Sequence, residues 1–423
     1  MDRSIALSQE VAWHTSNKRT IFISPSTLID CWERQLIEIC GIKDSFDKRS
    51  RTIQSLSDQT KKLWTIFNLN RDALDRDYMS DEKFLSGYLS AFFIPNVERV
   101  RHALINSRIE NIVSDLCERE VLRILDFGAG PLSATFGTLI AIEMLLAGSV
   151  SIKTKRIEIT AVERSEKAIQ FGIQCIEKSK NKDIDFVTER LTSIPKQKKF
   201  DIILAANVLN EVPQKHQATT LNSLIEAMSK ETPSLMLALE PGQDSHSRRL
   251  SELRDHILTG TSLATKKIIA PCPHERPCPL SPSMNRLDWC WFRSKFPPPI
   301  FQLELDAKSK LDHTELAYCY FLISEAGSTT KKKPWAICVS DEMPAGKEEQ
   351  REKRATYFKK NASGITLLSD EMINELAEHG QKTKLCTAEG SLLGGLRQRT
   401  EQSKFSRGDP AAQKDFDLLI NER

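Results

Sequence analysis

The sequence predicts an α/β fold in which a parallel β-sheet is covered by helices on both faces. Three observations indicate it: a helical pattern that ends at a short buried strand, five strand-like segments that alternate with helix-like ones, and a glycine-rich turn after the first strand. Buried parallel strands read as continuous runs of Val, Leu and Ile, whereas surface helices repeat apolar residues every three to four positions. Their alternation is typical of a doubly wound sheet.

The region before the first strand has helical periodicity. Apolar residues recur at helical spacing, with charges between them, in STLIDCWERQLIEIC, QTKKLWTIFNLNR and DEKFLSGYLSAFFIPNVERV. Residues 1–25 show no such pattern. We therefore expect a helical N-terminal domain over residues 1–115.

The sheet itself is expected within residues 116–260, as a Rossmann-like domain. The apolar stretch 132–146 is too short to span a bilayer, so we interpret it as a buried helix. The expected strands lie at 121–127, 156–163, 183–189, 200–208 and 233–241.

The chain changes character after residue 260, where cysteines and prolines gather. We expect a small cysteine-rich module over 261–392, with short strands, and a flexible tail over 393–423. The charged stretch 341–363 is interpreted as a loop or a surface helix. Strand-like segments of the module lie at 316–324, 334–340 and 383–390.

Composition limits the class of protein. With 40% apolar and 28% charged residues, the chain has the balance of a soluble globular protein. A net charge of +3 does not by itself indicate a nucleic-acid or membrane partner. The N-terminus has neither the apolar core of a signal peptide nor the Arg-rich, acid-poor character of a transit peptide. We expect a reducing, cytoplasm-like compartment and no membrane segment.

The glycine turn follows the first strand and reads Asp126-Phe-Gly128-Ala-Gly130. Glycines let the backbone turn tightly and approach a ligand closely. A dinucleotide fold needs a third glycine to seat the pyrophosphate, and that position is Ser133. S-adenosylmethionine has no phosphate, and an acidic residue such as Asp126 can pair its ammonium, so the turn fits this cofactor better.

Glu163 ends the second strand, where an acid can accept both ribose hydroxyls of a nucleoside. The alternative is a glycine turn in a domain without a ligand, with Glu163 as a surface charge. The fourth strand leads into Asn207-Val-Leu-Asn210-Glu211, which lacks the Pro-Pro-aromatic continuation of many base-amine methylases. Asn207, Asn210 and Glu211 are candidates to line a methyl-transfer site, or else a helix cap with a first-turn acid.

Cys272, Cys278 and Cys290 fall within nineteen residues, in a loop stiffened by prolines. Thiolates in a stiff loop suit zinc or an iron–sulfur cluster, although these spacings match neither a zinc knuckle nor a ferredoxin run. The alternative is unliganded thiols. A metal site needs a fourth ligand, and Cys386 is the first candidate. The fallbacks are Cys338, Cys319 and His274.

Four strings occur in one order along the chain: DFGAGPLSAT, LALEPGQDSHSRRLSELRDHIL, IIAPCPHERPCPL…DWCWF and TKLCTAEG. In this the chain resembles the methyltransferase-like family of small-ribosomal-subunit proteins, which includes mitochondrial small-subunit assembly proteins and bacterial relatives. The resemblance covers residues 90–392. The Pro-Cys-Pro-His…Cys-Pro-Leu…Asp-Trp-Cys string is its most specific part.

The resemblance implies a Rossmann-like methyltransferase domain and binding to the small ribosomal subunit or its RNA. It also implies a four-iron, four-sulfur cluster, with zinc as the alternative metal. It implies a bacterial cytoplasm or, in a eukaryote, the mitochondrial matrix. Carried over position by position, the cluster ligands are Cys272, Cys278, Cys290 and Cys386.

Two functions follow: an S-adenosylmethionine-dependent methyltransferase acting on small-subunit rRNA, or a non-catalytic assembly factor that keeps the fold as a binding platform. A third is a zinc-stabilised methyltransferase with another substrate. The sequence names no catalytic residue, target nucleotide or oligomeric state. The basic candidates for RNA contact are Arg248, Arg249, Arg254, Lys266, Lys267 and the run 331–333.

Overall fold

The chain folds as two compact units in a computed structural model. The first comprises Met1–Leu239 with Ser294–Leu316, and the second comprises Glu240–Arg293 with Ala317–Arg423. The described residues are 20–40, 48–69, 78–146, 152–231, 233–260, 266–280, 289–325, 336–339, 343–344, 355–361, 364–367, 380–389, 391–398, 407–411 and 417–421.

Helices fill the part of the first unit that precedes the sheet, as the periodicity predicts. The first of them begins at Ser24, whose hydroxyl accepts the N–H of Thr27 at 3.4 Å and so satisfies one free donor of the first turn. Their contacts place them in the same unit as the sheet. These elements are α2 (Pro25–Ile39), α3 (Lys48–Leu69), the 3₁₀ turn η3 (Tyr78–Ser80), α4 (Glu82–Tyr88), the π-helical turn η4 (Leu89–Phe93), α5 (Ile94–Ile105) and α6 (Glu110–Cys117).

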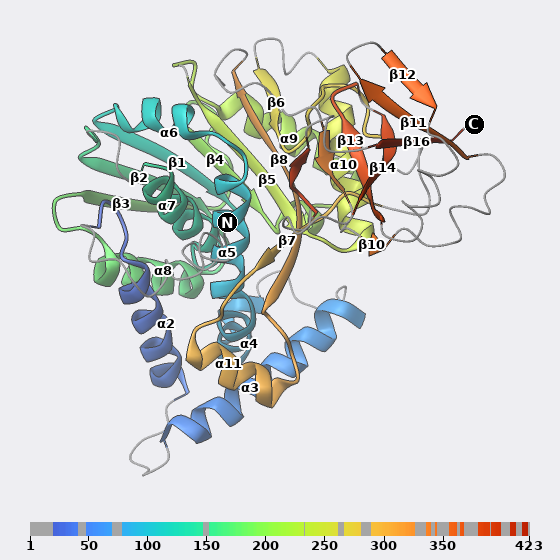
Figure 1. Ribbon diagram of the computed structural model, residues 1–423. Helices are drawn as coiled ribbons and strands as arrows, with labels where there is room; N and C mark the ends of the chain where they lie inside the picture. The colour runs from blue at the N-terminus through green and yellow to red at the C-terminus, as the bar shows by residue number, and fades with distance from the viewer. Residues whose placement is uncertain are drawn as a thin grey trace. The chain divides into compact units, whose positions relative to one another are not determined.

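The sheet of the first unit has the strand order β3-β2-β1-β4-β5, and its neighbouring strands run parallel (Figure 1). The chain goes from β1 outward to β3 and then returns to β4 on the other side of β1. This reversal is the switch point of a Rossmann-like sheet, which confirms the predicted α/β fold. The strands are β1 (Val121–Phe127), β2 (Arg156–Val162), β3 (Asp185–Leu191), β4 (Ile202–Ala206) and β5 (Leu235–Pro241).

Three helices connect these strands: α7 (Ser133–Leu145), α8 (Glu166–Ser179) and α9 (Gln214–Ala227). Because parallel crossovers are right-handed, α7 and α8 cover one face and α9 the other. Phe93 contacts Phe136 of α7 and Phe171 of α8, with ring centroids 5.8 and 5.2 Å apart, which agrees with that arrangement. Helix α7 is almost wholly buried, as expected of the apolar stretch 132–146.

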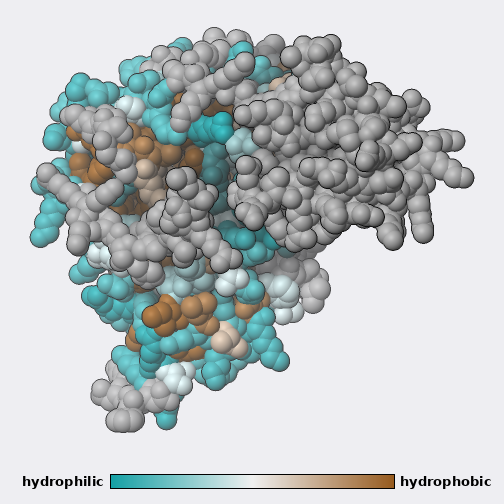
Figure 2. Space-filling model, in the orientation of Figure 1, coloured by the Kyte–Doolittle hydropathy of each residue, from teal (hydrophilic) through white to brown (hydrophobic). Residues whose placement is uncertain are grey.

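Helix α11 (Ile300–Ser309) also belongs to the first unit, far along the chain from the helices it contacts. Its Phe301 packs edge-on against Trp32 of α2, with ring centroids 5.5 Å apart. Its Ile300 is 70% exposed, and Figure 2 shows apolar surface in the lower part of the view, where Figure 1 places α11. In the described part of the chain no helix is long and apolar enough to cross a membrane.

The second unit holds α10 (Asp244–Thr259), the antiparallel strands β6 (Lys266–Ala270) and β8 (Glu315–Glu325), and a separate sheet. This sheet has the order β12-β11-β16-β14-β13-β9-β15, with β10 on β13. Its strands are β9 (Ala336–Cys338), β10 (Met343–Pro344), β11 (Ala355–Asn361), β12 (Gly364–Leu367), β13 (Gly380–Thr387), β14 (Leu392–Gln398), β15 (Pro410–Ala411) and β16 (Asp417–Asn421). Strand β7 (Phe292–Lys295) pairs with β8.

The structure differs from two expectations in this unit. The stretch 341–363, expected as a loop or surface helix, contains β10 and most of its second half is β11. The expected tail 393–423 contains most of β14, all of β15 and all of β16. Strands β15 and β16 pair with partners distant in sequence, so local periodicity and charge give no sign of them. Strands β11 and β14 also form local hairpins with β12 and β13, and neither hairpin was expected.

The buried carboxylate of Glu98 tests the packing of the first unit. Glu98 is 0% exposed and accepts hydrogen bonds from two nitrogens of the Arg101 guanidinium, Nε and Nη2, and from the Ser294 hydroxyl, all at 2.7 Å. We expect Glu98→Gln to lower the free energy of unfolding by about 3 kcal/mol, because it leaves the buried Arg101 guanidinium without its counter-ion. Urea unfolding measures it. Glu118→Gln, at an exposed pair with Lys153, should change stability by less than about 1 kcal/mol. Equal effects would contradict the prediction.

Candidate functional site

The glycine turn lies at the carboxyl edge of the sheet, between the ends of β2 and β4. Gly128 has φ +69° and donates its N–H to the carbonyl of Val162 at 2.9 Å. A Cβ at Gly128 would lie 2.2 Å from a methyl carbon of Val208. Glycine is therefore required here by both its dihedral and its surroundings.

Glu163 ties this turn to the start of α8. One carboxylate oxygen accepts the N–H of Gly130 at 2.9 Å, and the other accepts the N–H of Ser165 at 2.8 Å. Beside Gly130, which has φ +49°, there is room: the closest described atoms to an added Cβ are those of Met79 and Tyr88, at 3.9 Å. The space next to Gly130 is thus bordered by the Met79 and Tyr88 side chains but not filled by them.

Asp126 is buried beneath the turn. Its carboxylate accepts the hydroxyl of Thr135 at 2.7 Å and the N–H of the same residue at 3.3 Å. Burial raises the pKa of this carboxyl to about 7, although the bonds from Thr135 act in the opposite direction. The structure therefore gives Asp126 a partner in the first turn of α7, and its pairing with a ligand ammonium stays a prediction.

Asn207 follows β4 with the left-handed φ of +59°, which is uncommon for a residue with a side chain. Its N–H donates to the carbonyl of Leu239 at 2.7 Å. Its Oδ1 is buried and has no hydrogen-bond partner among the described residues. A buried acceptor without a donor is costly, so this atom is suited to accept from a bound ligand.

Three polar residues missed in the sequence lie near the same edge: Tyr88, Asn96 and Arg99. The Asn96 amide donates to the Tyr88 hydroxyl at 3.4 Å and accepts from Arg99 at 2.7 Å. Burial, and then the charges of Glu211 and Glu163, raise the pKa of Tyr88. Tyr88 immediately precedes the π-helical turn η4, and Asn96 and Arg99 lie in α5 after it. Such π-helical turns are frequent at functional sites. The sequence gives no spacing that links them to the glycine turn.

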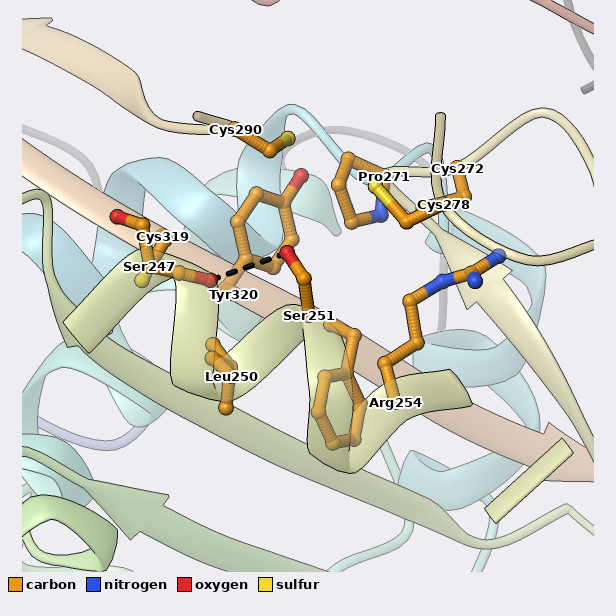
Figure 3. A pocket seen from close by; sticks show the side chains of 11 residues that line it. Ser247, Leu250, Ser251, Arg254, Pro271, Cys272, Cys278, Cys290, Cys319 and Tyr320 are labelled. Atoms are coloured by element: carbon orange, nitrogen blue, oxygen red, sulfur yellow. Dashed lines mark hydrogen bonds between the residues drawn. The ribbon is translucent and has the colours of Figure 1, made fainter. Parts of the chain in front are cut away.

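The four predicted cysteines come together in the second unit. Cys278 and Cys386 belong to one buried cluster, and Cys290 packs against it. Cys272, Cys278 and Cys290 line a small hollow of about 20 Å³ that is partly open to solvent (Figure 3). Burial, and then the proximity of the Cys272 thiolate, raises the pKa of Cys278 to about 12. Charging several of these thiols together is therefore unfavourable without a cation.

The fallback ligands are placed differently. Cys338 packs in another cluster, with Ala336 and Leu385. Cys319 lines the hollow, but its thiol donates to the carbonyls of Glu240 and Pro241 at 3.6 Å.

The remaining fallback, His274, is buried beside Cys386. Its Nδ1 lies 3.1 Å from the carbonyl oxygen and 3.2 Å from the backbone nitrogen of Arg276, and its Nε2 lies 3.2 Å from the Cys386 sulfur. His274 thus supports a cysteine ligand from outside.

A single metal ion is not accommodated by the described side chains, because no group of three or more His, Cys, Asp or Glu among them is arranged to hold one. Around a tetrahedral zinc at ~2.3 Å the four sulfurs would be about 3.8 Å apart.

The basic candidates for RNA contact are mostly engaged within the protein. The expectation is wrong for Arg254, which is buried. Lys266 is largely buried and pairs with Glu325 at 2.8 Å. Arg248 and Arg249 pair with acids of their own helix, whereas Lys267 is half-exposed, 3.8 Å from Glu275. The run 331–333 lies outside the described residues.

Comparison with known families decides the relationship. Residues 103–349, more than half of the chain, match the family described as mitochondrial small ribosomal subunit Rsm22. The chain belongs to the Rsm22 family. The expected resemblance to small-ribosomal-subunit proteins is thereby confirmed.

A human relative is similar over a short stretch. The mitochondrial ribosome assembly protein METTL17 of Homo sapiens is 29% identical over 85 residues, which are 19% of this chain. The match covers only 18% of the length of the human protein.

Solved methyltransferases share little with the chain. The N-methyltransferase NodS of Bradyrhizobium japonicum is 12% identical, with 62% of this chain and 98% of NodS covered and a TM-score of 0.30. The magnesium protoporphyrin IX methyltransferase of Synechocystis is also 12% identical, with 59% and 97% covered and a TM-score of 0.31. Likenesses this low carry no argument about function, and the strand order defines the fold.

The two glycines of the turn give a matched pair of substitutions. We expect Gly128→Ala to lower the free energy of unfolding by about 3 kcal/mol, because the added carbon adds a collision with Val208 to the strain of a positive φ. Gly130→Ala carries only the strain of its φ, about 1–2 kcal/mol. Chemical denaturation compares them. Equal losses would show that the turn does not pack against Val208 as described.

Proposed function

We propose that this Rsm22-family chain binds the small ribosomal subunit, holds a four-iron, four-sulfur cluster, and uses S-adenosylmethionine at the carboxyl edge of its Rossmann-like sheet. The observation that carries the proposal is the meeting of Cys272, Cys278, Cys290 and Cys386 around one buried site. These positions are up to 114 residues apart in the sequence and come from three separate segments. A shared ligand explains why they converge.

The donor set suits an iron–sulfur cluster or zinc, and the family resemblance favours the cluster. Thiolates are the usual ligands of iron–sulfur clusters, and the raised pKa of Cys278 indicates that the thiolates need a bound cation to be stable.

The cofactor site rests on three features of the sheet edge. Glycines at 128 and 130 bring the backbone to the edge, Glu163 directly follows β2 at this edge, and Asn207 offers an unsatisfied acceptor. S-adenosylmethionine bound there would supply an electrophilic methyl group. The residues of this chain would bind and orient it, since methyl transfer depends mainly on positioning.

The partner follows from the family. Membership in a family of small-ribosomal-subunit proteins supports binding to that subunit or its rRNA, in the mitochondrial matrix or a bacterial cytoplasm. The name of the human relative, a ribosome assembly protein, supports a role in assembly. The bonds between Glu163 and backbone N–H groups favour a second candidate, a non-catalytic assembly factor, because they serve the fold without a ligand.

The metal content of anaerobically purified protein tests the cluster. We expect near-stoichiometric iron and sulfide with a broad visible absorption band in the unaltered chain. Cys278→Ser should lose most of the iron and lower the melting temperature, because cluster binding contributes to folding. Cys319→Ser is the matched control in the same hollow, and it should keep its iron. Zinc without sulfide, or no metal, would refute the cluster.

Calorimetric titration with S-adenosylmethionine tests the second site. We expect saturable binding by the unaltered chain and about tenfold weaker binding by Glu163→Gln, which corresponds to ~1.4 kcal/mol. A melting curve of the variant controls for loss of folding. No saturable binding by the unaltered chain would reject the cofactor and leave the non-catalytic assembly factor.

A further inference from the structure

Arg254 is a buried cation at the edge of the cysteine site. It lies on α10 and is 3% exposed, although a guanidinium stays charged at any physiological pH. A buried charge is costly unless it is paired and hydrogen-bonded. Its partners therefore indicate why it is there.

Two of its nitrogens clamp the cysteine loop. One donates to the carbonyl of His274 at 3.0 Å, and the other donates to the carbonyl of Arg276 at 2.9 Å and to Asp255 at 2.6 Å. The Asp255 carboxylate in turn accepts the N–H of Cys278, at 3.1 Å and 3.0 Å from its two oxygens. Neighbouring residues of α10 thus hold the loop between Cys272 and Cys278.

The third nitrogen of the guanidinium, Nε, is buried and has no hydrogen-bond partner among the described residues. Arg254 lines the same hollow as Cys272, Cys278 and Cys290, and Figure 3 shows its side chain rising from α10 beside Cys278. An N–H donor without a partner at the wall of this hollow is suited to donate to a bound group that carries hydrogen-bond acceptors. Thiolate and sulfide sulfurs are such acceptors.

The charges agree with this position. Burial opposes the charge of Arg254, but the thiolates of Cys272 and Cys278, together with Asp255, outweigh it and raise the pKa of the guanidinium. The attraction is mutual, so Arg254 favours negative charge at the cysteines. The charges of the Asp255 carboxylate and the Arg254 guanidinium cancel, so the negative charge of the thiolates must be offset by the metal.

We propose that Arg254 is a positioning residue that sets the reduction potential of the bound cluster, an inference that rests on the proposed function. One-electron reduction adds a negative charge to the site. A fixed cation and an N–H donor at the wall stabilise the reduced state more than the oxidised one, which makes the potential less negative. The electron comes from an external one-electron donor, which is oxidised as one ferric ion of the cluster becomes ferrous, and no proton is taken up.

The test is a potentiometric titration of the anaerobically purified full chain, followed by electron paramagnetic resonance. We expect Arg254→Gln to lower the ratio of reduced to oxidised cluster about tenfold at a given potential, a shift of ~59 mV for one electron. Arg254→Lys keeps the charge and should shift the ratio less. Arg249→Gln is the matched control on the same helix, where the side chain is paired with Glu252 and absent from the hollow, and it should leave the ratio unchanged.

Iron and sulfide are measured in every variant. An iron-loaded Arg254→Gln with the unaltered potential would overturn the proposal. If Arg254→Gln binds no cluster, Arg254→Lys decides. A cluster bound by Arg254→Lys would support the role of the positive charge, and a folded Arg254→Lys protein without a cluster would refute the proposal. An unaltered chain without iron and sulfide would be a failure of the proposed cluster itself, a result that the same metal assay separates from the others.

Discussion

The parallel pairing of β1 with β2 on one side and β4 on the other is the constraint on which the cofactor edge depends. It brings the carboxyl ends of three strands together, and the glycine turn must pass between them. The contact of Gly128 with Val208 leaves no room for a side chain, so the turn is held close to the sheet. Glu163 and Asn207 are functional candidates because this pairing places them at the same edge.

In the second unit the main constraint on the cysteines is the free-energy cost of removing charged thiolates from water. Buried thiols resist ionisation, and the fold offsets this with the few polar groups that it brings to the loop. Arg254, Asp255 and His274 each bond to the cysteine loop or to a cysteine. Arg254 and Asp255 were not candidate ligands, and His274 was a fallback. In the proposed metal site all three would orient the cysteines and set the local charge, which is the general task of residues around a metal.

The sequence predicted the sheet, because five apolar runs and a glycine turn are local signals. It also identified the four cysteines as candidate ligands: three lie in one proline-rich loop, and Cys386 was the first candidate for the fourth, which the family resemblance includes as well. It did not predict β16, whose pairing is long-range, and it also missed β11 and β14, which have one local hairpin partner and one distant partner each. It assigned Arg254 to RNA because burial is not readable from one basic residue in a polar helix. Tyr88 and Asn96 were missed because tertiary packing alone brings them to the edge.

The hydrogen bond between His274 and Cys386 joins positions 112 residues apart. Such a contact forms late during synthesis, because both segments must have left the ribosome before β13 can pair with β9 and β14. Three of the four thiols are therefore made long before the fourth. A chain interrupted before β13 would carry an incomplete set, so the finished site distinguishes a fully translated protein from a truncated one.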